Sequence, residues 1–588
     1  MIYINLLKIT LLTKQYERSK TTIPDVFDKT VAKFPDKPCV LFQEESWSFR
    51  EIQAYSNKVG NLLHAQGFTE GDVVAVFTEN CPQYMPLWLG MSKIGVVAAL
   101  VNFNLRDIAL SHCIKVSNAK AVIFGGNLAA AIKDVLPSLP SGVKYFSLGE
   151  CSEAGLAHES FDSEIAKTSA SRPAMAVRSP RDPLFYIYTS GTTGMPKAAV
   201  VSHMRYILMA WAITLFLKVT DKDTLYIPLP LYHSAGGILG TGQAILAGTT
   251  LAIRPKFSAS QFWADCVKYR CTAAQYIGEI ARYILAQPFR EEEKRHSVRV
   301  MFGNGIKPQI WSQFQERFKV PLIGEFYGAT EGNCNMINFE NKVGAVGFTT
   351  RILPAVYPIT LVKVDPATGQ VVRDPATGVC VKSEPGEPGE LVGKIVKGNA
   401  SRDFDGYVDG TATDKKIIRD VFRKGDSCFS TGDILVMDDL GYMYFRDRTG
   451  DTFRWRGENV STNEVEAVVS NAVQLQDAVV YGVEVAGSEG RAGMAAIVDQ
   501  DNSIDMEQLA VALARSLPSY ARPLFVRLIK EADTTGTFKL KKTALRDEGY
   551  DVTKVKDDRM YFMNPASRKY ELLTPESYQD IQQGRVRL

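Results

Sequence analysis

Short apolar runs, many ending in Gly, Asn, Ser or Thr, alternate with longer helical patterns over most of this 588-residue chain. The clearest runs span residues 73–77, 121–124, 184–188, 225–228, 250–253, 298–302 and 322–326. Because strands that alternate with helices form layered, mostly parallel sheets, the pattern predicts an α/β fold. In such folds the loops that follow the strands bind ligands, so function is expected there.

The pattern changes near residue 360, which predicts a region of different structure. Two copies of DPATG, at residues 365–369 and 374–378, predict turns that border a hairpin. Residues 438–455 predict two hairpins, with turns at 439–441 and 449–451. Beyond them, a helix over 461–470 with Ser461 as its N-cap and strands at 478–483, 494–498 and 524–529 predict a small α+β domain.

These changes divide the chain into three predicted parts. They are a short amino-terminal segment (1–21), a large domain (22–447) and a carboxyl-terminal domain (448–588). The last part has about 140 residues, which is enough to fold independently.

Composition excludes several classes of protein. Lys and Arg number 68 and Asp and Glu 65, and the net charge of +3 is too small for bulk nucleic-acid binding. The nine cysteines contain no CxxC pair, so we expect mostly buried free thiols in a reducing compartment and no structural zinc. No stretch reaches the roughly 20 apolar residues that span a bilayer, and residues 206–217 predict a buried helix. The first twelve residues, MIYINLLKITLL, predict a short surface helix, with a weak membrane anchor as the alternative.

The strongest local signal is YTSGTTGMPK at residues 188–197, directly after an apolar strand. Glycines let the backbone approach a phosphate, hydroxyls can donate to phosphate oxygens, and Lys197 adds a positive charge. The string is not a Walker loop, which needs Ser or Thr after its Gly-Lys pair. The predicted nucleotide-binding residues are Tyr188, Thr189, Ser190, Gly191, Thr192, Thr193, Gly194, Met195, Pro196 and Lys197.

This string resembles the phosphate loop of the adenylate-forming superfamily, which includes the acyl-CoA synthetases. Further motifs match that superfamily in the same order along the chain. The resemblance implies that His233, at the end of PLPLYH, lines the acyl pocket and orients the carboxylate. It also implies that Gly303, Asn304 and Gly305 border the adenine.

The string YGATE, residues 327–331, resembles the next superfamily motif. Tyr327 can stack on adenine, and Thr330 can bind the α-phosphate. Glu331 offers the hard oxygen that Mg²⁺ prefers, so it is the predicted metal ligand. Gly328 and Ala329 complete this predicted nucleotide-binding segment.

Asp433, in the string TGD, resembles the superfamily's ribose clamp, because one carboxylate can accept hydrogen bonds from two vicinal hydroxyls. Arg448, fifteen residues later, matches the arginine at the junction of the two domains, which contacts ribose or phosphate. Gly450 then occupies the position of the pivot, where a residue without Cβ can absorb a large change of φ and ψ.

Two motifs of the small domain complete the resemblance. Gly457, in RGENVSTNEVE, matches the glycine that faces the pantetheine tunnel during thioester formation. The string TTGTFKLKK at residues 534–542 resembles the loop with the adenylation lysine, which would be Lys539. Many relatives have Ser-Gly before that lysine, whereas this chain has Thr-Phe, so Lys541 and Lys542 remain alternatives.

Longer strings are similar to the fatty acid transport protein family, also called very-long-chain acyl-CoA synthetases. Among them are EEEKRHSVRVMFGNG and LIGEFYGATEGN, and the similarity runs from about residue 22 to the end. The chain resembles the animal long-chain branch of the family more than the bile-acid branch. It implies an α/β fold with a large adenylate-forming domain of layered sheets and helices and a small, mobile α+β domain. Family members carry an amino-terminal hydrophobic anchor. Here about twenty residues precede the similar region, so either this start is internal or the form is peripheral.

The resemblance implies an ATP-dependent long-chain or very-long-chain fatty acid–CoA ligase, whose activity is coupled to fatty-acid uptake. Lys539, His233 and Lys197 would be catalytic, with ATP, Mg²⁺ and coenzyme A as cofactors or co-substrates. We expect membrane association at the endoplasmic reticulum or plasma membrane, facing the cytosol, and no nucleic-acid partner; homo-oligomerisation is left open. The alternatives are a membrane fatty-acid carrier without chemistry, an inactive acyl-binding relative, and an adenylating enzyme with another acceptor.

Overall fold

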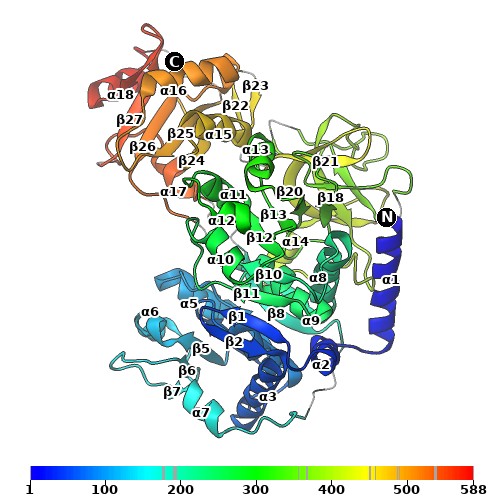
Figure 1. The fold of residues 1–588 in the computed structure, drawn as a ribbon. Coiled ribbons are helices and arrows are strands. Elements are labelled where there is room, and N and C mark those ends of the chain that lie inside the picture. Colours follow the sequence, from blue (N-terminus) through cyan, green and yellow to red (C-terminus); the bar gives the residue numbers. More distant parts are fainter. Residues whose placement is uncertain are drawn as a thin grey trace.

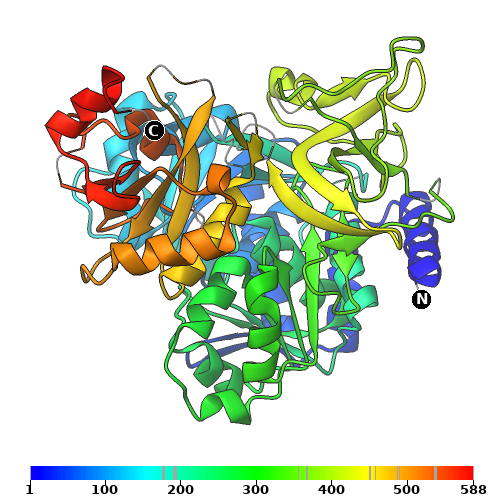
Figure 2. The same ribbon diagram turned by 90° about the horizontal axis from the view of Figure 1, so that it is seen from above.

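The fold is that of a large amino-terminal domain followed by a small carboxyl-terminal domain (Figure 1). The computed structural model describes residues 2–174, 176, 179–189, 195–354, 357–365, 368–448, 452–456, 458–486, 488, 490–534, 540–555, 557–586 and 588. Viewed from above, the small domain lies over one side of the large domain, and α1 (Ile2–Arg18) lies at the opposite edge (Figure 2).

The first sheet of the large domain has the strand order β7-β6-β5-β3-β4-β8-β9. All its neighbours are parallel except β8 and β9. Its strands are β3 (Val73–Phe77), β4 (Val97–Leu100), β5 (Ala121–Gly125), β6 (Lys144–Leu148), β7 (Glu159–Ser160), β8 (Pro183–Thr189) and β9 (Lys197–Ser202).

The second sheet has the order β15-β14-β13-β12-β10-β11-β1-β2, with a parallel centre and antiparallel edges. Its strands are β1 (Pro38–Phe42), β2 (Glu45–Ser48), β10 (Thr224–Ile227), β11 (Thr250–Ile253), β12 (Ala273–Ile277), β13 (Val300–Asn304), β14 (Leu322–Tyr327) and β15 (Met336–Asn338). The apolar runs predicted as strands of the large domain are confirmed, with bounds that shift by at most two residues.

Helices form a layer between these sheets and cover their outer faces. β3 shows why: Val74 and Val76 point into the core between the sheets, whereas Val73, Ala75 and Phe77 point into the outer core. A strand buried on both faces needs apolar residues throughout. The central layer contains α2 (Ile23–Lys33), α3 (Phe49–Ala65), α4 (Tyr84–Lys93), α8 (His203–Leu217) and α9 (Thr241–Ala247). The outer layers contain α5 (Asp107–Val116) and α6 (Ala129–Val135) on the first sheet, and α10 (Phe262–Lys268), α11 (Gly278–Leu285) and α13 (Pro308–Phe318) on the second.

A third, antiparallel sheet packs beside these layers. Its order is β16-β21-β20-β18-β17, with β19 on β20. Its strands are β16 (Gly347–Phe348), β17 (Ile359–Val362), β18 (Pro388–Lys394), β19 (Ile417–Arg419), β20 (Ser427–Met437) and β21 (Tyr442–Arg448). Short helices α7 (Phe161–Lys167), α12 (Glu292–Arg295) and α14 (Gly410–Asp414) join neighbouring elements.

The small domain has its own buried core around a five-stranded sheet. The sheet contains β24 (Ala478–Glu484), β25 (Arg491–Val498), β26 (Phe525–Ile529), β27 (Arg559–Asn564) and β28 (Lys569–Leu572). Its helices are α15 (Thr462–Ala472), α16 (Met506–Ser516), α17 (Thr543–Glu548) and α18 (Pro575–Gln582). Ser461 caps α15 as predicted, because its side chain accepts from the Glu464 N–H.

The second hairpin predicted within residues 438–455 is wrong. β21 pairs with β20 and β16, whereas β22 (Phe453–Trp455) pairs with β23 (Glu458–Val460). Phe453 and Trp455 are buried in the small-domain core, and that burial decides the pairing of β22.

Two predicted helices are present. Residues 206–217 lie in the buried helix α8, and the amino-terminal apolar segment lies in α1. Within the described part of the chain, no helix combines the length and apolar character needed to cross a bilayer.

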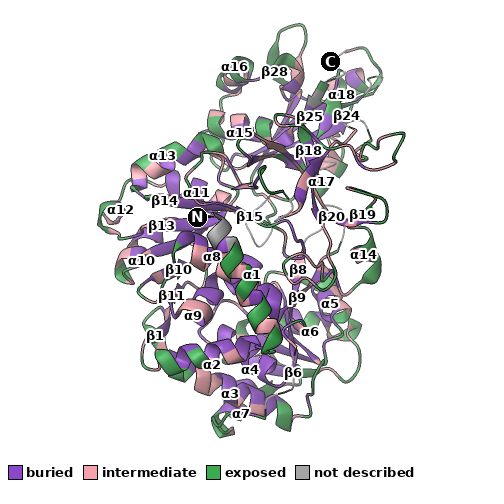
Figure 3. Ribbon diagram, turned by 90° about the vertical axis from the view of Figure 1, so that its right-hand side faces the viewer, coloured by how far each residue is buried: buried purple, intermediate pink, exposed green. Residues whose placement is uncertain are grey.

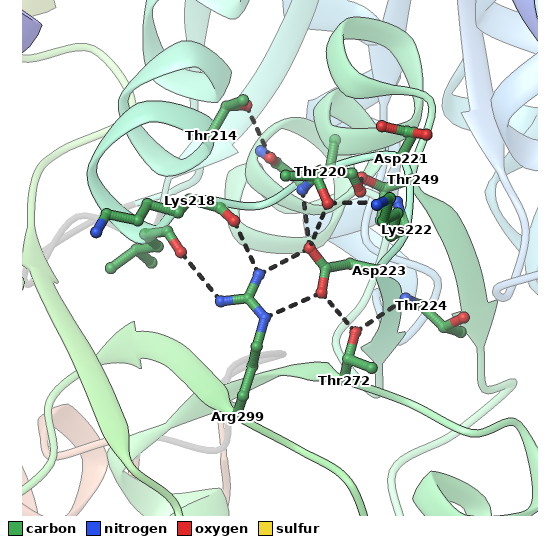
Figure 4. Close-up of polar contacts among 12 residues, drawn as sticks. Thr214, Lys218, Thr220, Asp221, Lys222, Asp223, Thr224, Thr249, Thr272 and Arg299 are labelled. Atoms are coloured by element: carbon green, nitrogen blue, oxygen red, sulfur yellow. Dashed lines mark hydrogen bonds and ion pairs between the residues drawn. The ribbon is translucent and has the colours of Figure 1, made fainter.

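A charged network joins the amino ends of strands in the second sheet (Figure 4). The buried Asp223 carboxylate accepts from the Arg299 guanidinium at 2.7 and 3.1 Å, from the Thr272 hydroxyl at 2.7 Å, and from the Thr220 N–H at 2.8 Å. Burial by itself raises the pKa of Asp223, but these hydrogen bonds and the guanidinium hold it below its ordinary value. The network therefore stabilises the fold only while this carboxylate is ionised.

Asp223→Asn is expected to lower the free energy of unfolding by roughly 1.5–3 kcal/mol, the usual contribution of hydrogen bonds to a charged group. Because the folded-state pKa is depressed, this stability is present above the unfolded-state pKa of about 3.9 and is lost as pH falls through the folded-state value. The difference in thermal midpoint between wild type and variant should therefore become smaller as the pH falls from 7 to 3. Asp221→Asn, which touches none of these contacts, is the control; a constant difference at all pH values would contradict the assignment.

Candidate active site

The two domains enclose a cleft of about 2790 Å³, and most predicted site residues line it. Those lining residues are Tyr188, Thr189, Met195, Pro196, Lys197, His233, Asn304, Gly305, Tyr327, Gly328, Ala329, Thr330, Glu331, Asp433 and Arg448. Gly303 lies one residue before this set, in β13. Ser190, Gly191, Thr192, Thr193, Gly194, Gly450, Gly457 and Lys539 lie outside the described residues.

The predicted phosphate loop joins two antiparallel strands. Thr189 at the end of β8 is in register with Lys197 at the start of β9. The Pro196 carbonyl oxygen is 3.0 Å from Nε2 of His112, which anchors the end of the loop on α5. The Tyr188 hydroxyl donates to the Cys113 carbonyl at 2.6 Å, so its ring is held by α5 as well.

The loop with Thr330 and Glu331 is held from beneath by α8. Buried Arg205 donates to the carbonyl oxygens of Ala329 at 3.2 Å and Thr330 at 2.7 Å, and also to that of Gly332. These contacts fix the loop backbone, because a buried guanidinium must satisfy its donors. The sequence did offer a signal for Arg205, since a charge in a buried apolar helix needs partners.

Glu331 and Lys197 meet through Tyr407. The Tyr407 hydroxyl donates to Oε1 of Glu331 at 2.6 Å, and Nζ of Lys197 lies 5.6 Å from the centre of the Tyr407 ring. Burial, and then the neighbouring Glu331 carboxylate, raise the pKa of Tyr407 above its ordinary value, so the hydroxyl stays a donor. Sequence reasoning missed Tyr407, which lies 76 residues from Glu331 and in no recognised motif.

His233 lies in the turn after β10, at the start of the helical segment Ala235–Gly240. Its Nδ1 accepts from the Ala235 N–H at 3.3 Å. A neutral ring with Nδ1 as acceptor carries its proton on Nε2. Beside it, the Ser234 hydroxyl lies 3.0 Å from that of Thr330, which joins the predicted carboxylate and phosphate ends of the site.

The predicted adenine loop is fixed by a buried carboxylate. Glu325 accepts from the Gly305 N–H and, through its other oxygen, from the Tyr276 hydroxyl. Gly305 has φ +87°, and a Cβ at Gly303 would lie 2.0 Å from the Tyr276 carbonyl oxygen. Larger residues at either glycine would therefore displace the loop.

Asp433 and Arg448 face each other across the hairpin of β20 and β21. The two residues are in register, and Nε of Arg448 is 3.4 Å from Oδ1 of Asp433. The Tyr327 hydroxyl donates to Oδ2 at 2.5 Å. The fifteen-residue spacing is therefore a strand register that places a carboxylate, a guanidinium and an aromatic ring together.

In the small domain, Thr534, Leu540 and Lys541 line the cleft, and Thr534 pairs with Leu540 across the intervening segment. Nζ of Lys542 lies 2.7 Å from Glu466 and 3.1 Å from the Thr462 hydroxyl. Lys542 is thus engaged within the small domain.

A charged contact, here called the interlobe latch, fastens the two domains. It consists of Arg282 and Tyr283 on α11 with Leu475 and Asp477, which precede β24. Arg282 donates to the Leu475 carbonyl and the Asp477 carboxylate, and the Tyr283 hydroxyl donates to Asp477 at 3.0 Å. The latch joins the domains, and Thr534 and Leu540 of the small domain line the same cleft as Glu331.

The chain matches two family models, AMP-binding enzyme over residues 27–400 and AMP-binding enzyme C-terminal domain over residues 464–539. Among solved structures, it is similar to ATP-bound MatB from Rhodopseudomonas palustris (TM-score 0.73, 22% identity, 90% of this chain and 100% of that one). It is also similar to a fatty acyl CoA synthetase of Mycobacterium tuberculosis (TM-score 0.63, 23% identity, 91% and 99%). Both likenesses show the adenylate-forming fold.

Closer relatives are long-chain fatty acid transport proteins. The chain is 49% identical to long-chain fatty acid transport protein 1 of Mus musculus over 96% of its own length and 88% of the relative's. It is 37% identical to long-chain fatty acid transport protein 6 of Homo sapiens over 99% and 94%. This chain therefore belongs to the AMP-binding enzymes and, among them, to the long-chain fatty acid transport protein family.

Proposed function

We propose that this protein is an ATP-dependent fatty acid–CoA ligase for long or very long acyl chains, and that thioester formation drives fatty-acid uptake. The observation that carries the proposal is the convergence of Lys197, Glu331, His233 and the Asp433–Arg448 pair in one cleft. Membership of the long-chain fatty acid transport proteins supports the acyl substrate. We further propose that the protein associates with a membrane surface and faces the cytosol.

In the first half-reaction, the carboxylate attacks the α-phosphorus of ATP, and pyrophosphate leaves. His233 would orient the carboxylate, and Lys197 would bind the departing phosphates. Asp433 would accept from the ribose hydroxyls, with Tyr327 beside the adenine. Lys539 would neutralise charge that develops on the carboxylate and α-phosphate oxygens.

Glu331 fits the role of metal ligand, because it is an anionic oxygen donor at 7% exposure, oriented by Tyr407 beside Lys197. Mg²⁺ typically binds one or two carboxylates and completes its shell with water and phosphate oxygens. When bound, it supplies shielding of charge on the β- and γ-phosphates. Glu331, oriented by the Tyr407 hydroxyl, would hold the ion, and the ammonium group of Lys197 beside Tyr407 would add positive charge for the phosphates.

In the second half-reaction, the CoA thiolate attacks the acyl carbonyl, and AMP leaves. Lys539 and the thiol need the same approach, so we propose that the small domain turns at Gly450 and presents the Gly457 face instead.

The test is ATP/pyrophosphate exchange and AMP release by the purified full chain with fatty acids of increasing length. Exchange that depends on fatty acid, followed by acyl-CoA formation, is expected. Fatty-acid binding without exchange would instead identify a carrier or an inactive acyl-binding relative, and adenylate without thioester would indicate another acceptor.

Tyr407→Phe is expected to lower kcat/KM for ATP by about 10–10²-fold, because a hydrogen bond to a charged group contributes roughly 1.5–3 kcal/mol. Loss of the hydroxyl would let the Glu331 carboxylate rotate away from the phosphates. Tyr442→Phe is the matched control, because it removes a Tyr–Glu hydrogen bond, to Glu340, away from the cleft. Steady-state kinetics at several Mg²⁺ concentrations measure the effect, and equal losses in the two variants would refute it.

A further inference from the structure

One face of α8 forms an apolar arm of the cleft that leads away from Glu331 and His233. The arm starts at Arg205, which holds the Thr330 loop. It continues along α8 through residues at helical spacing, namely Leu208, Met209, Ala212, Ile213 and Phe216. At about 1.5 Å per residue, the distance from Arg205 to Phe216 is roughly 16 Å.

The second wall of the arm comes from β15 and the residues after it. Met336, Ile337 and Phe339 line the same cleft. The rings of Phe216 and Phe339 lie 5.1 Å apart, so α8 and the segment after β15 meet at that end of the arm. The arm thus joins the predicted carboxylate site to an apolar end.

The outer wall is α1, which lies beside α8 across the face of the large domain (Figure 3). Ile9 and Thr13, one turn apart, line the cleft, and Thr13 is 8% exposed. The Asn5 amide donates to the Leu215 carbonyl at 3.3 Å, and Glu17 pairs with Arg181, so both ends of α1 are fastened. Leu11, by contrast, is 58% exposed on the opposite face.

We propose that α1 is the outer wall of the acyl-chain site, and that Ile9 and Thr13 set the longest tail that the protein accepts. This rests on the proposed ligase function. The hydrocarbon core of a bilayer, about 30 Å, holds two acyl layers, so an arm of roughly 16 Å accommodates one long-chain tail. Each methylene group that the arm buries raises the affinity for the acid about fourfold. A substitution that shortens the arm therefore lowers the affinity only for acids long enough to reach the part that is lost.

Ile9→Trp and Thr13→Trp should therefore lower kcat/KM for palmitate by at least about tenfold and leave octanoate unchanged. Leu11→Trp adds the same ring to the exposed face of the same helix and should change kcat/KM for neither acid. Ile9→Ala should act in the opposite direction and raise the rate with acids longer than palmitate. Thermal midpoints of all four variants show whether each one folds.

Binding separates this proposal from the proposed function. Displacement of a fluorescent fatty acid, measured without ATP or coenzyme A, should show the same loss for the two tryptophan variants on α1's inner face. Suppose that the wild type ligates fatty acids but Ile9→Trp and Thr13→Trp leave the ratio of kcat/KM for palmitate to that for octanoate unchanged, or that Leu11→Trp changes it equally. Either result would refute the role of α1 as the outer wall. If binding shifts as expected but no acid is ever adenylated, the wall stands and the ligase proposal fails.

Discussion

Lys539→Ala is expected to slow acyl-adenylate formation by about 10²–10³-fold, the usual cost of removing a group that stabilises developing charge. Thioester formation from supplied acyl-adenylate should be almost unchanged, because the carboxylate and α-phosphate are already joined in that substrate. ATP/pyrophosphate exchange measures the first half-reaction, and single turnover of purified acyl-adenylate with coenzyme A measures the second.

Lys541→Ala is the matched control for this experiment. Its side chain is 56% exposed, and its Nζ lies 4.0 Å from Asp533, so its removal should affect neither half-reaction. If Lys541→Ala shows the selective loss and Lys539→Ala does not, the adenylation lysine is Lys541. Equal loss in both half-reactions for Lys539→Ala would contradict its role.

Asp433→Ala is expected to raise KM for ATP about 100-fold. Two hydrogen bonds from ribose hydroxyls to a carboxylate contribute roughly 1.5 kcal/mol each, and both would be lost. The variant also removes the partner of Tyr327 and Arg448, so the substitution alone does not isolate the ribose contact.

A thermodynamic cycle that combines Asp433→Ala with a nucleotide lacking the ribose hydroxyls isolates the ribose contact. The wild type should lose about the same factor with 2′,3′-dideoxy-ATP, whereas Asp433→Ala should discriminate little between the two nucleotides. Tyr327→Phe, which removes the hydroxyl's contacts to Asp433 and Thr431 but keeps the ring, should keep most of that discrimination. Discrimination in Asp433→Ala as strong as in the wild type would show that the ribose lies elsewhere.

Local patterns predicted the strands well, because apolar runs that end in small polar residues are buried on both faces whatever surrounds them. The same locality explains the Asp433–Arg448 spacing, which is a hairpin register within one short segment. Strand pairings that depend on packing against distant parts of the chain were not predicted. The pairing of β22 depends on burial of Phe453 in the small-domain core, and residues 438–455 alone contain no signal for that burial.

The contacts that hold the site were missed for the same reason. Arg205 reaches carbonyls about 125 residues away, and Tyr407 reaches back to Glu331. The spacing of these residues in the sequence predicts neither contact, because the partners come together only when the three sheets of the large domain assemble. Lys93 is a further case: it is fully buried and donates to Ser56 and Asn57, although the sequence shows it only as a charge within the apolar stretch 86–103.

The interlobe latch bears on the timing of catalysis. A turn of the small domain that separates Asp477 from α11 would break this partly buried ion pair in every cycle, at about 1.5–3 kcal/mol, because Arg282 keeps its second partner, Glu279. Turnover of 1–10³ per second corresponds to a barrier of about 13–17 kcal/mol, so this step alone would not be limiting. It would instead favour the closed arrangement of the resting enzyme by roughly 10–10² to one, until departure of pyrophosphate or arrival of the thiol reverses that preference.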